Sequence, residues 1–170
     1  MKLVNSKNAN LSSLTSVSLS IVHTDLGAVF HGYSSDITRT FLPNRTEIDE
    51  CDEKMANMTL QDLWSTVYAA QTAAIAALTT NHTCADVDLA ARGVIEDAGL
   101  GKYFTHRLGH GLGIEGHERP YLNKGNTHIK LRAGNVFTAE PGIPSSDKVD
   151  ERYLHRARRG CTIGRRSAGH

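Results

Sequence analysis

The sequence has no long apolar run, few aromatic residues and almost no net charge. Aromatic side chains make up 6% of 170 residues, and 19 basic against 18 acidic side chains leave a net charge of +1. No segment approaches the roughly 20 apolar residues of a membrane span, and a near-neutral chain attracts neither nucleic acid nor membranes. Residues 1–22 also lack the unbroken apolar block of a signal peptide. We therefore expect a cytoplasmic protein that binds neither nucleic acid nor membrane.

Cysteine is scarce as well. Cys51, Cys84 and Cys161 are odd in number, widely spaced, and form no C-x-x-C pair. This spacing indicates neither a disulfide framework nor a zinc ribbon. A chain of this length can bury a core without such crosslinks. One domain held by its apolar core is therefore expected.

Apolar periodicity predicts β-rich ends around two helices. The predicted strands include turns at Gly27 and Gly32, and the second helix has Thr83 as its N-cap and Gly99 as its end. The predicted elements are strands within 17–33, a β-rich segment at 34–41, helices at 47–79 and 83–100, and a short strand at 135–143. This order is typical of an α+β domain with an antiparallel or mixed sheet.

Composition divides the chain into three parts. We expect a polar segment at 1–20, a domain at 21–144 and a basic, disordered tail at 145–170. The tail holds seven basic against three acidic side chains, or +4, which leaves −3 for the first 144 residues. An arginine-rich tail can bind nucleic acid, but a solvated end without a partner is the interpretation we favour.

The stretch THRLGHGLGIEGHERPYL, residues 105–122, concentrates three histidines and four glycines. Gly111, Gly113 and Gly116 match the G-x-G-x-x-G pattern, but Pro120 would end the helix that a dinucleotide site needs. Tyr121 stands where H-E-x-x-H requires its second histidine, which excludes that zinc motif. The remaining hypothesis is a metal whose other ligands lie elsewhere in the sequence.

Three acidic residues in predicted strands could supply those ligands. Asp25, Asp36 and Glu140 are each surrounded by apolar or small residues. A buried carboxylate is costly unless it is paired or binds a cation. Asp25 and Asp36 are eleven residues apart across a turn, so adjacent strands of one hairpin could bring them together. Taken singly, each would more often be a turn or edge residue; together with the histidines they favour a site.

Three ordered segments resemble the M24 metallopeptidases of the pita-bread fold. They are DLGAVFHGYSSDITRTF, the histidine stretch above, and FTAEPGI, and within that family they are most similar to Xaa-Pro dipeptidases (prolidases) and Xaa-Pro aminopeptidases. The resemblance covers about residues 21–143 and implies an α+β pita-bread catalytic domain, incomplete at its C-terminus and altered or truncated at both ends. It implies hydrolysis of the bond before proline in dipeptides or at peptide N-termini.

The resemblance also assigns residues and cofactors. It implies two divalent ions, Mn²⁺ first and Co²⁺ or Zn²⁺ as alternatives, a proline-containing peptide as substrate, and a homodimer as one assembly. Hydroxide generated between the ions would attack the scissile carbonyl. The metal ligands implied are Asp25, Asp36, His110 and Glu140, and the catalytic residues that contact substrate and the oxyanion are His106 and His117. The glycines near His110 would let the backbone approach the metals.

The chain departs from that family pattern after FTAEPGI. The family has a fifth ligand, a glutamate in a strand 15–25 residues further on. The nearest glutamate, Glu151, lies 8 residues after FTAEPGI, short of that position, and has no strand pattern around it. No histidine occurs in residues 1–22, where prolidase-like members have one. These departures favour the occupancy of a single metal site, and they leave a second hypothesis open. The alternative is a catalytically impaired pita-bread module that binds peptides or protein partners without turnover.

Overall fold

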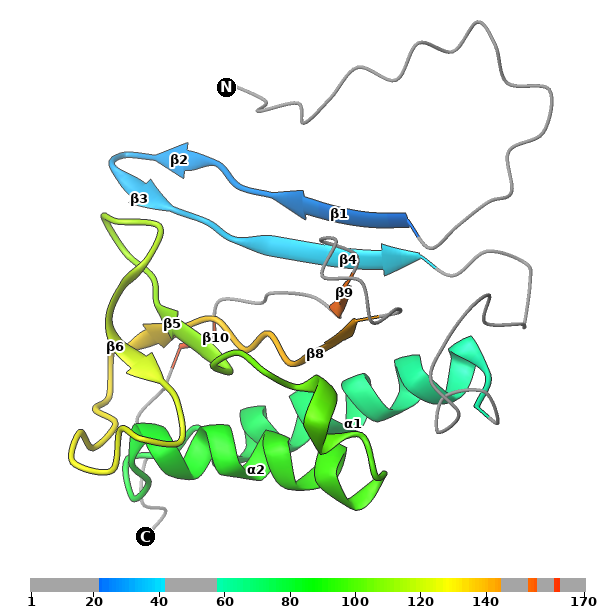
Figure 1. Cartoon of the computed structure of the whole chain (residues 1–170). Coiled ribbons are helices and arrows are strands. Elements are labelled where there is room, and N and C mark those ends of the chain that lie inside the picture. Colours follow the sequence, from blue (N-terminus) through cyan, green and yellow to red (C-terminus); the bar gives the residue numbers. More distant parts are fainter. Residues whose placement is uncertain (1–21, 42–57, 145–152, 156–160, 163–170) are drawn as a thin grey trace, which may run out of the picture.

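The structure, a computed structural model, describes residues 22–41, 58–144, 153–155 and 161–162 (Figure 1). Two helices pack against each other on one side of the molecule, and the strands lie over them (Figure 1). In chain order the elements are β1 (Val22–Leu26), β2 (Val29–Phe30), β3 (Tyr33–Ser34), β4 (Ile37–Phe41), α1 (Leu60–Ala77), α2 (Cys84–Asp97), a 3₁₀ turn (Gly101–Tyr103), β5 (Gly109–Gly111), β6 (Glu118–Leu122), β7 (Val136–Phe137), β8 (Gly142–Pro144), β9 (Tyr153–His155) and β10 (Cys161–Thr162). The content of helices and strands agrees with the α+β prediction.

Strands β1 to β4 form a long two-stranded ribbon. β1 pairs antiparallel with β4, and β2 with β3, in a register that places Asp25 opposite Thr38. The hairpin turns at His31 and Gly32, whose φ angles are 49° and 85°. Positive φ at both central residues matches the right-handed twist of the flanking strands, and glycine adopts it without strain. The predicted turn at Gly32 is therefore confirmed.

Both helices begin at a threonine that closes a capping box. The hydroxyls of Thr59 and Thr83 accept from backbone N–H groups three residues later, and the carboxylates of Asp62 and Asp86 accept from the threonine N–H groups at 2.9 and 2.7 Å. These bonds satisfy donors that the first helical turn leaves unpaired. Gly99, with φ 74°, follows α2. The predicted cap and the predicted end of the second helix are both confirmed.

The core lies between the helices and the strands that follow them. The helix predicted at 47–79 begins at Leu60, and residues 47–57 lie outside the described residues. Leu60, Leu63, Val67, Ala70 and Ala74 are buried at helical spacing, whereas Trp64 is half-buried and stacks on Tyr68. The largest fully buried core side chains are Leu63, Val67, Ile95, Leu100, Phe104, Leu108, Leu122, Phe137 and Ile143.

The four-stranded sheet has the order β10-β7-β5-β6, and β8 pairs with β9. Strands β9 and β10 lie within 145–170, where the sequence predicts a disordered tail. These five residues are strands, and the rest of that segment, like 1–20, lies outside the described residues, so the boundaries at 20 and 144 stay predictions. In the described part of the chain, neither helix has the length and hydropathy of a transmembrane segment.

Candidate metal centre

Gly109 allows β5 and β7 to approach closely enough to build the site. A Cβ atom at Gly109 would overlap the carbonyl oxygen of Thr138, and one at Gly111 would lie 2.8 Å from the carbonyl oxygen of Glu118. Glycine is the residue that fits so close an approach of two backbones. Both glycines lie against the backbone of neighbouring segments, whereas the sequence predicted that they would let the backbone approach metal ions. The tight pairing of β5 sets the position of His110.

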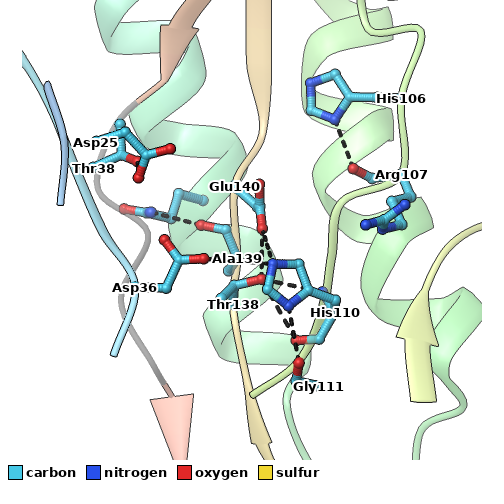
Figure 2. A network of polar contacts seen from close by, with 11 residues as sticks. Asp25, Asp36, Thr38, His106, Arg107, His110, Gly111, Thr138, Ala139 and Glu140 are labelled. Atoms are coloured by element: carbon cyan, nitrogen blue, oxygen red, sulfur yellow. Dashed lines mark hydrogen bonds and ion pairs between the residues drawn. The ribbon is translucent and has the colours of Figure 1, made fainter. Parts of the chain in front are cut away.

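The imidazole of His110 has a carbonyl oxygen beside one nitrogen and two carboxylates beside the other. Its Nδ1 lies 2.9 Å from the carbonyl oxygen of Gly111, which places the proton on Nδ1 and the lone pair on Nε2. Nε2 lies 2.9 Å from Oε1 of Glu140 and 3.6 Å from Oδ2 of Asp36 (Figure 2). This nitrogen is buried and makes no hydrogen bond to any described residue. A buried acceptor between two carboxylates has the chemistry of a metal ligand.

Glu140 is buried, with 7% of its surface exposed. Its Oε1 accepts a hydrogen bond of 2.6 Å from the hydroxyl of Thr138, and its backbone N–H donates to the carbonyl of Leu108 at 2.8 Å. A buried carboxylate is costly unless such donors or a cation compensate it. Glu140 therefore lies where the sequence predicted a ligand, beside His110.

Asp36 and His117 complete a tight group with His110. Among the described residues, one ligand atom from each of the three lies within 4.8 Å of the others. The rings of His110 and His117 meet edge to face, with 4.2 Å between centroids. Carboxylate oxygen and imidazole nitrogen together suit Zn²⁺, Co²⁺ or Mn²⁺. The residues present therefore fit a divalent ion, and His117, expected to contact substrate, lies within ligand distance.

Asp25 shares a face of the ribbon with Asp36 but stands outside that group. Its carboxylate accepts a hydrogen bond of 3.2 Å from the hydroxyl of Thr38, the residue opposite it on β4. Side chains alternate along a strand, so Thr38 and Asp36 point the same way as Asp25 (Figure 2). The hairpin thus brings the two aspartates to one face, as the sequence predicted. Asp25 is the more exposed of the two.

His106 lies apart from the others, towards helix α2 (Figure 2). Its Nδ1 is 2.7 Å from the carbonyl oxygen of Arg107, and its ring packs edge to face on Phe104 at 5.0 Å. Burial lowers the pKa of His106 below its ordinary value, while the Arg107 carbonyl and the charge of Glu140 act in the opposite direction. A neutral imidazole at pH 7 follows, able to donate from one nitrogen only.

Sequence reasoning missed the residues that hold the ligands in place. Thr138 lies two residues before Glu140 in the segment that the sequence predicts as a strand, so period-two alternation could have found it. Gln71 in α1 donates to the carbonyl of Ala139 at 2.9 Å. Asp88 and Arg92 in α2 are spaced i, i+4, which in sequence predicts a solvated surface pair. Nothing in the sequence shows that this pair faces inward.

Comparisons with known proteins agree with this geometry. The profile of metallopeptidase family M24 matches residues 9–164. An uncharacterised peptidase of Schizosaccharomyces pombe is 52% identical over 127 residues, covering 74% of this chain and 26% of its own. The prolidase from Pyrococcus furiosus matches with a TM-score of 0.66 and 32% identity, over 85% of this chain and 38% of that one. The X-Pro aminopeptidase from Thermotoga maritima gives 0.62 and 30%, over 81% and 35%.

These matches confirm the predicted α+β pita-bread fold. The chain spans about a quarter of the length of its yeast relative, at 26%, and 35% to 38% of the two solved structures. It therefore corresponds to part of these proteins. The Xaa-Pro activities in the names of the two solved structures belong to those two proteins.

Proposed function

Because this chain belongs to metallopeptidase family M24, we propose that it binds a divalent metal ion and serves hydrolysis of the bond before proline in a peptide. The observation that carries the proposal is the buried Nε2 of His110, which faces Glu140 at 2.9 Å and Asp36 at 3.6 Å and makes no hydrogen bond to a described residue. Asp36, His110 and Glu140 would hold the first ion. Asp25, on the same face of the ribbon, is proposed for a second.

The residues around the site have separable roles in this proposal. When bound, the divalent ion supplies Lewis acidity to the scissile carbonyl and lowers the pKa of the attacking water. The Gly111 carbonyl accepts from Nδ1 of His110, which orients the ring so that Nε2 faces the carboxylates of Glu140 and Asp36. Thr138 holds one oxygen of Glu140 at 2.6 Å, and the carboxylate can pass a proton towards the leaving proline nitrogen.

His106 and His117 are proposed to contact the substrate. His117 is exposed and stands at ring contact with His110, so it can donate to a carbonyl oxygen that develops negative charge beside the metal. His106 is neutral at pH 7 because burial lowers its pKa, and its Nδ1–H donates to the Arg107 carbonyl, so its Nε2 could accept a hydrogen bond from the substrate. The prolidase and the X-Pro aminopeptidase among the matched structures support a proline-containing peptide as the substrate. Mn²⁺, Co²⁺ or Zn²⁺ as the bound ion and a homodimer as the assembly are part of the proposal.

The experiment combines metal analysis with turnover. Purified protein is titrated with Mn²⁺ and Co²⁺ by calorimetry and assayed for release of proline from Xaa-Pro dipeptides and of the first residue from Xaa-Pro peptides. Variants His110→Ala and Asp36→Asn are expected to lose more than about 100-fold in metal affinity, since even outer partners of ligands cost 10–100-fold. His128→Ala and Asp97→Asn, both exposed, are the matched controls. Metal affinity equal to wild type in His110→Ala would contradict the proposed site.

A second function is favoured by the position of Asp25. Like Glu140, it lies outside the group of Asp36, His110 and His117, whose ligand atoms are within 4.8 Å of one another, so among the described residues three candidate ligands form the compact set. We propose as the alternative a module that binds a proline-containing peptide without turnover. Calorimetric binding of a peptide by metal-loaded protein, with no product after prolonged incubation, distinguishes it from the enzyme.

A further inference from the structure

Helix α2 carries an ion pair on its buried face. Asp88 is fully buried and Arg92 is 8% exposed, among apolar neighbours such as Val87 and Ile95. The guanidinium binds the carboxylate in a fork, with Nε donating to Oδ2 at 2.8 Å and Nη2 to Oδ1 at 3.2 Å. Neither side chain is a candidate ligand. Their other hydrogen bonds indicate a different role.

The pair fixes three alternate residues of the segment before β5. Arg92 donates from Nη1 to the carbonyl of Phe104 at 2.6 Å and from Nη2 to the carbonyl of His106 at 3.0 Å. Its guanidinium also lies 4.2 Å from the centroid of the Phe104 ring. Asp88 Oδ1 accepts from the backbone N–H of Leu108 at 2.9 Å. The segment that leads to His110 is therefore tied to α2 at 104, 106 and 108.

The peptide groups of Leu108 connect this pair to both buried ligands of the proposed site. The Leu108 carbonyl accepts from the N–H of Glu140 at 2.8 Å. Two residues later, His110 accepts from the N–H of Thr138 at 2.9 Å and donates to the Thr138 hydroxyl at 3.1 Å. Two hydrogen bonds thus join Asp88 to the backbone of Glu140. Any displacement of Leu108 would change the 2.9 Å separation between His110 Nε2 and Glu140 Oε1.

Stability alone does not explain a buried ion pair. Desolvation of two charges offsets most of their attraction, and apolar residues of similar volume often stabilise a core as well or better. A fork of rigid donors, by contrast, determines geometry, and a lysine cannot reproduce it. The geometry points to Asp88 and Arg92 as positioning residues that set the spacing of His110 and Glu140 and thereby the affinity for metal. This inference rests on the metal site proposed above.

The test replaces the fork and keeps the charge. Arg92→Lys retains a cation beside Asp88 but loses the planar donors to Phe104 and His106. We expect its affinity for Co²⁺, followed by visible absorption of the bound ion, to fall about 10–100-fold, the range for outer partners of metal ligands. Arg132→Lys, an exposed arginine, is the matched control. Ile95→Val weakens the same buried face of α2 without touching the pair, and it should leave the affinity unchanged.

A second readout needs no metal. In metal-free protein, the amides of Leu108 and Glu140 should exchange with solvent at least about 10-fold faster in Arg92→Lys than in Ile95→Val, because only the former loosens the segment held by α2. If both amides and the Co²⁺ affinity match the controls, the positioning role is wrong. If wild-type protein binds no Co²⁺ while the exchange difference is found, the proposed metal site fails and the positioning of the segment stands. Equal exchange rates overturn the inference whatever the metal does.

Discussion

The two halves of the candidate site are held in different ways. His110 lies in β5 and Glu140 in the segment between β7 and β8, where backbone pairing, Thr138 and helix α2 fix them within the core. Asp25 and Asp36 come from the β1–β4 ribbon, which carries exposed apolar side chains, among them Phe30 at 76% and Val29 at 71%. The core half is preorganised by packing. The ribbon half is placed by its hairpin register and by a few contacts to the rest of the chain.

One of those contacts is a backbone hydrogen bond. Ser34 donates to the carbonyl of Gly113 at 2.7 Å, and its hydroxyl donates to the carbonyl of Ile114 at 3.4 Å. Asp36 follows two residues after Ser34, and His117 follows shortly after Ile114. The difference between the halves teaches that ligands held within the core can share one site with ligands on an exposed ribbon that has few contacts to the core. Ligand geometry would then depend most on how often the ribbon separates from the core.

Hydrogen exchange tests this difference with the largest expected effect. The amides of His110, Thr138 and Glu140 donate to β-partners or to buried acceptors, so they should open only in the larger unfolding events. The amides of Ser34 and Ser35, in the exposed hairpin, should open locally. We expect protection factors in the first group to exceed those in the second by at least about 10³-fold, measured by NMR at neutral pH. Equal protection would contradict the division into two halves.

Truncation of a core leucine should be far more damaging than truncation of a ribbon phenylalanine. Leu63 is fully buried between the helices and the strands, and Leu63→Ala should lower the free energy of unfolding by about 2–5 kcal/mol. Phe30 is 76% exposed, and Phe30→Ala should change that free energy by no more than about 0.5 kcal/mol. Urea unfolding followed by circular dichroism measures both. A large loss in Phe30→Ala would indicate that the ribbon packs more tightly than its exposure shows.

The helix caps give the smallest effect and a dependence on pH. The backbone N–H and hydroxyl of Thr83 lower the pKa of Asp86, as those of Thr59 lower the pKa of Asp62. A lowered folded pKa contributes stability that is present above the unfolded pKa, about 3.9, and is lost as pH falls through the folded value. Thr83→Ala should therefore cost about 1 kcal/mol at pH 7 and less at pH 3.

Thermal unfolding of Thr83→Ala at both pH values measures this change. Thr127→Ala, in an exposed loop, is the matched control and should differ from wild type at neither pH. A penalty that stayed constant between pH 7 and pH 3 would show that the carboxylate of Asp86 takes no part in the cap.

Local signals in the sequence predicted those parts of the fold that depend on neighbouring residues. Thr83 and Asp86 form a capping box three residues apart, and Gly99 ends α2, so both ends of that helix could be read directly. Hairpin spacing similarly predicted that Asp25 and Asp36 share a face. The predicted first helix included residues 58 and 59, which precede the observed start at Leu60, and there the prediction was wrong. The acidic residues before Leu60 continue the helical pattern of the sequence, so the pattern alone does not show where the helix begins.

Contacts between distant segments could not be predicted. The inward direction of Asp88 and Arg92 depends on the carbonyls of Phe104 and His106, which only the folded chain brings to α2. The ring contact of His117 with His110 likewise depends on the path of the loop between β5 and β6. Six site residues could be named from motifs, and the structure then separated them into a compact group and its periphery.

Gly109 offers a practical route to a reference protein for this site. Every side chain discussed as a ligand could be kept while β5 is pushed away from β7, because a single methyl group at position 109 would overlap the Thr138 carbonyl. Gly109→Ala would thus change the distances between the proposed ligand atoms and leave the ligand residues themselves unchanged. Such a protein would separate the contribution of ligand identity from that of ligand spacing, which no substitution of a ligand itself can do.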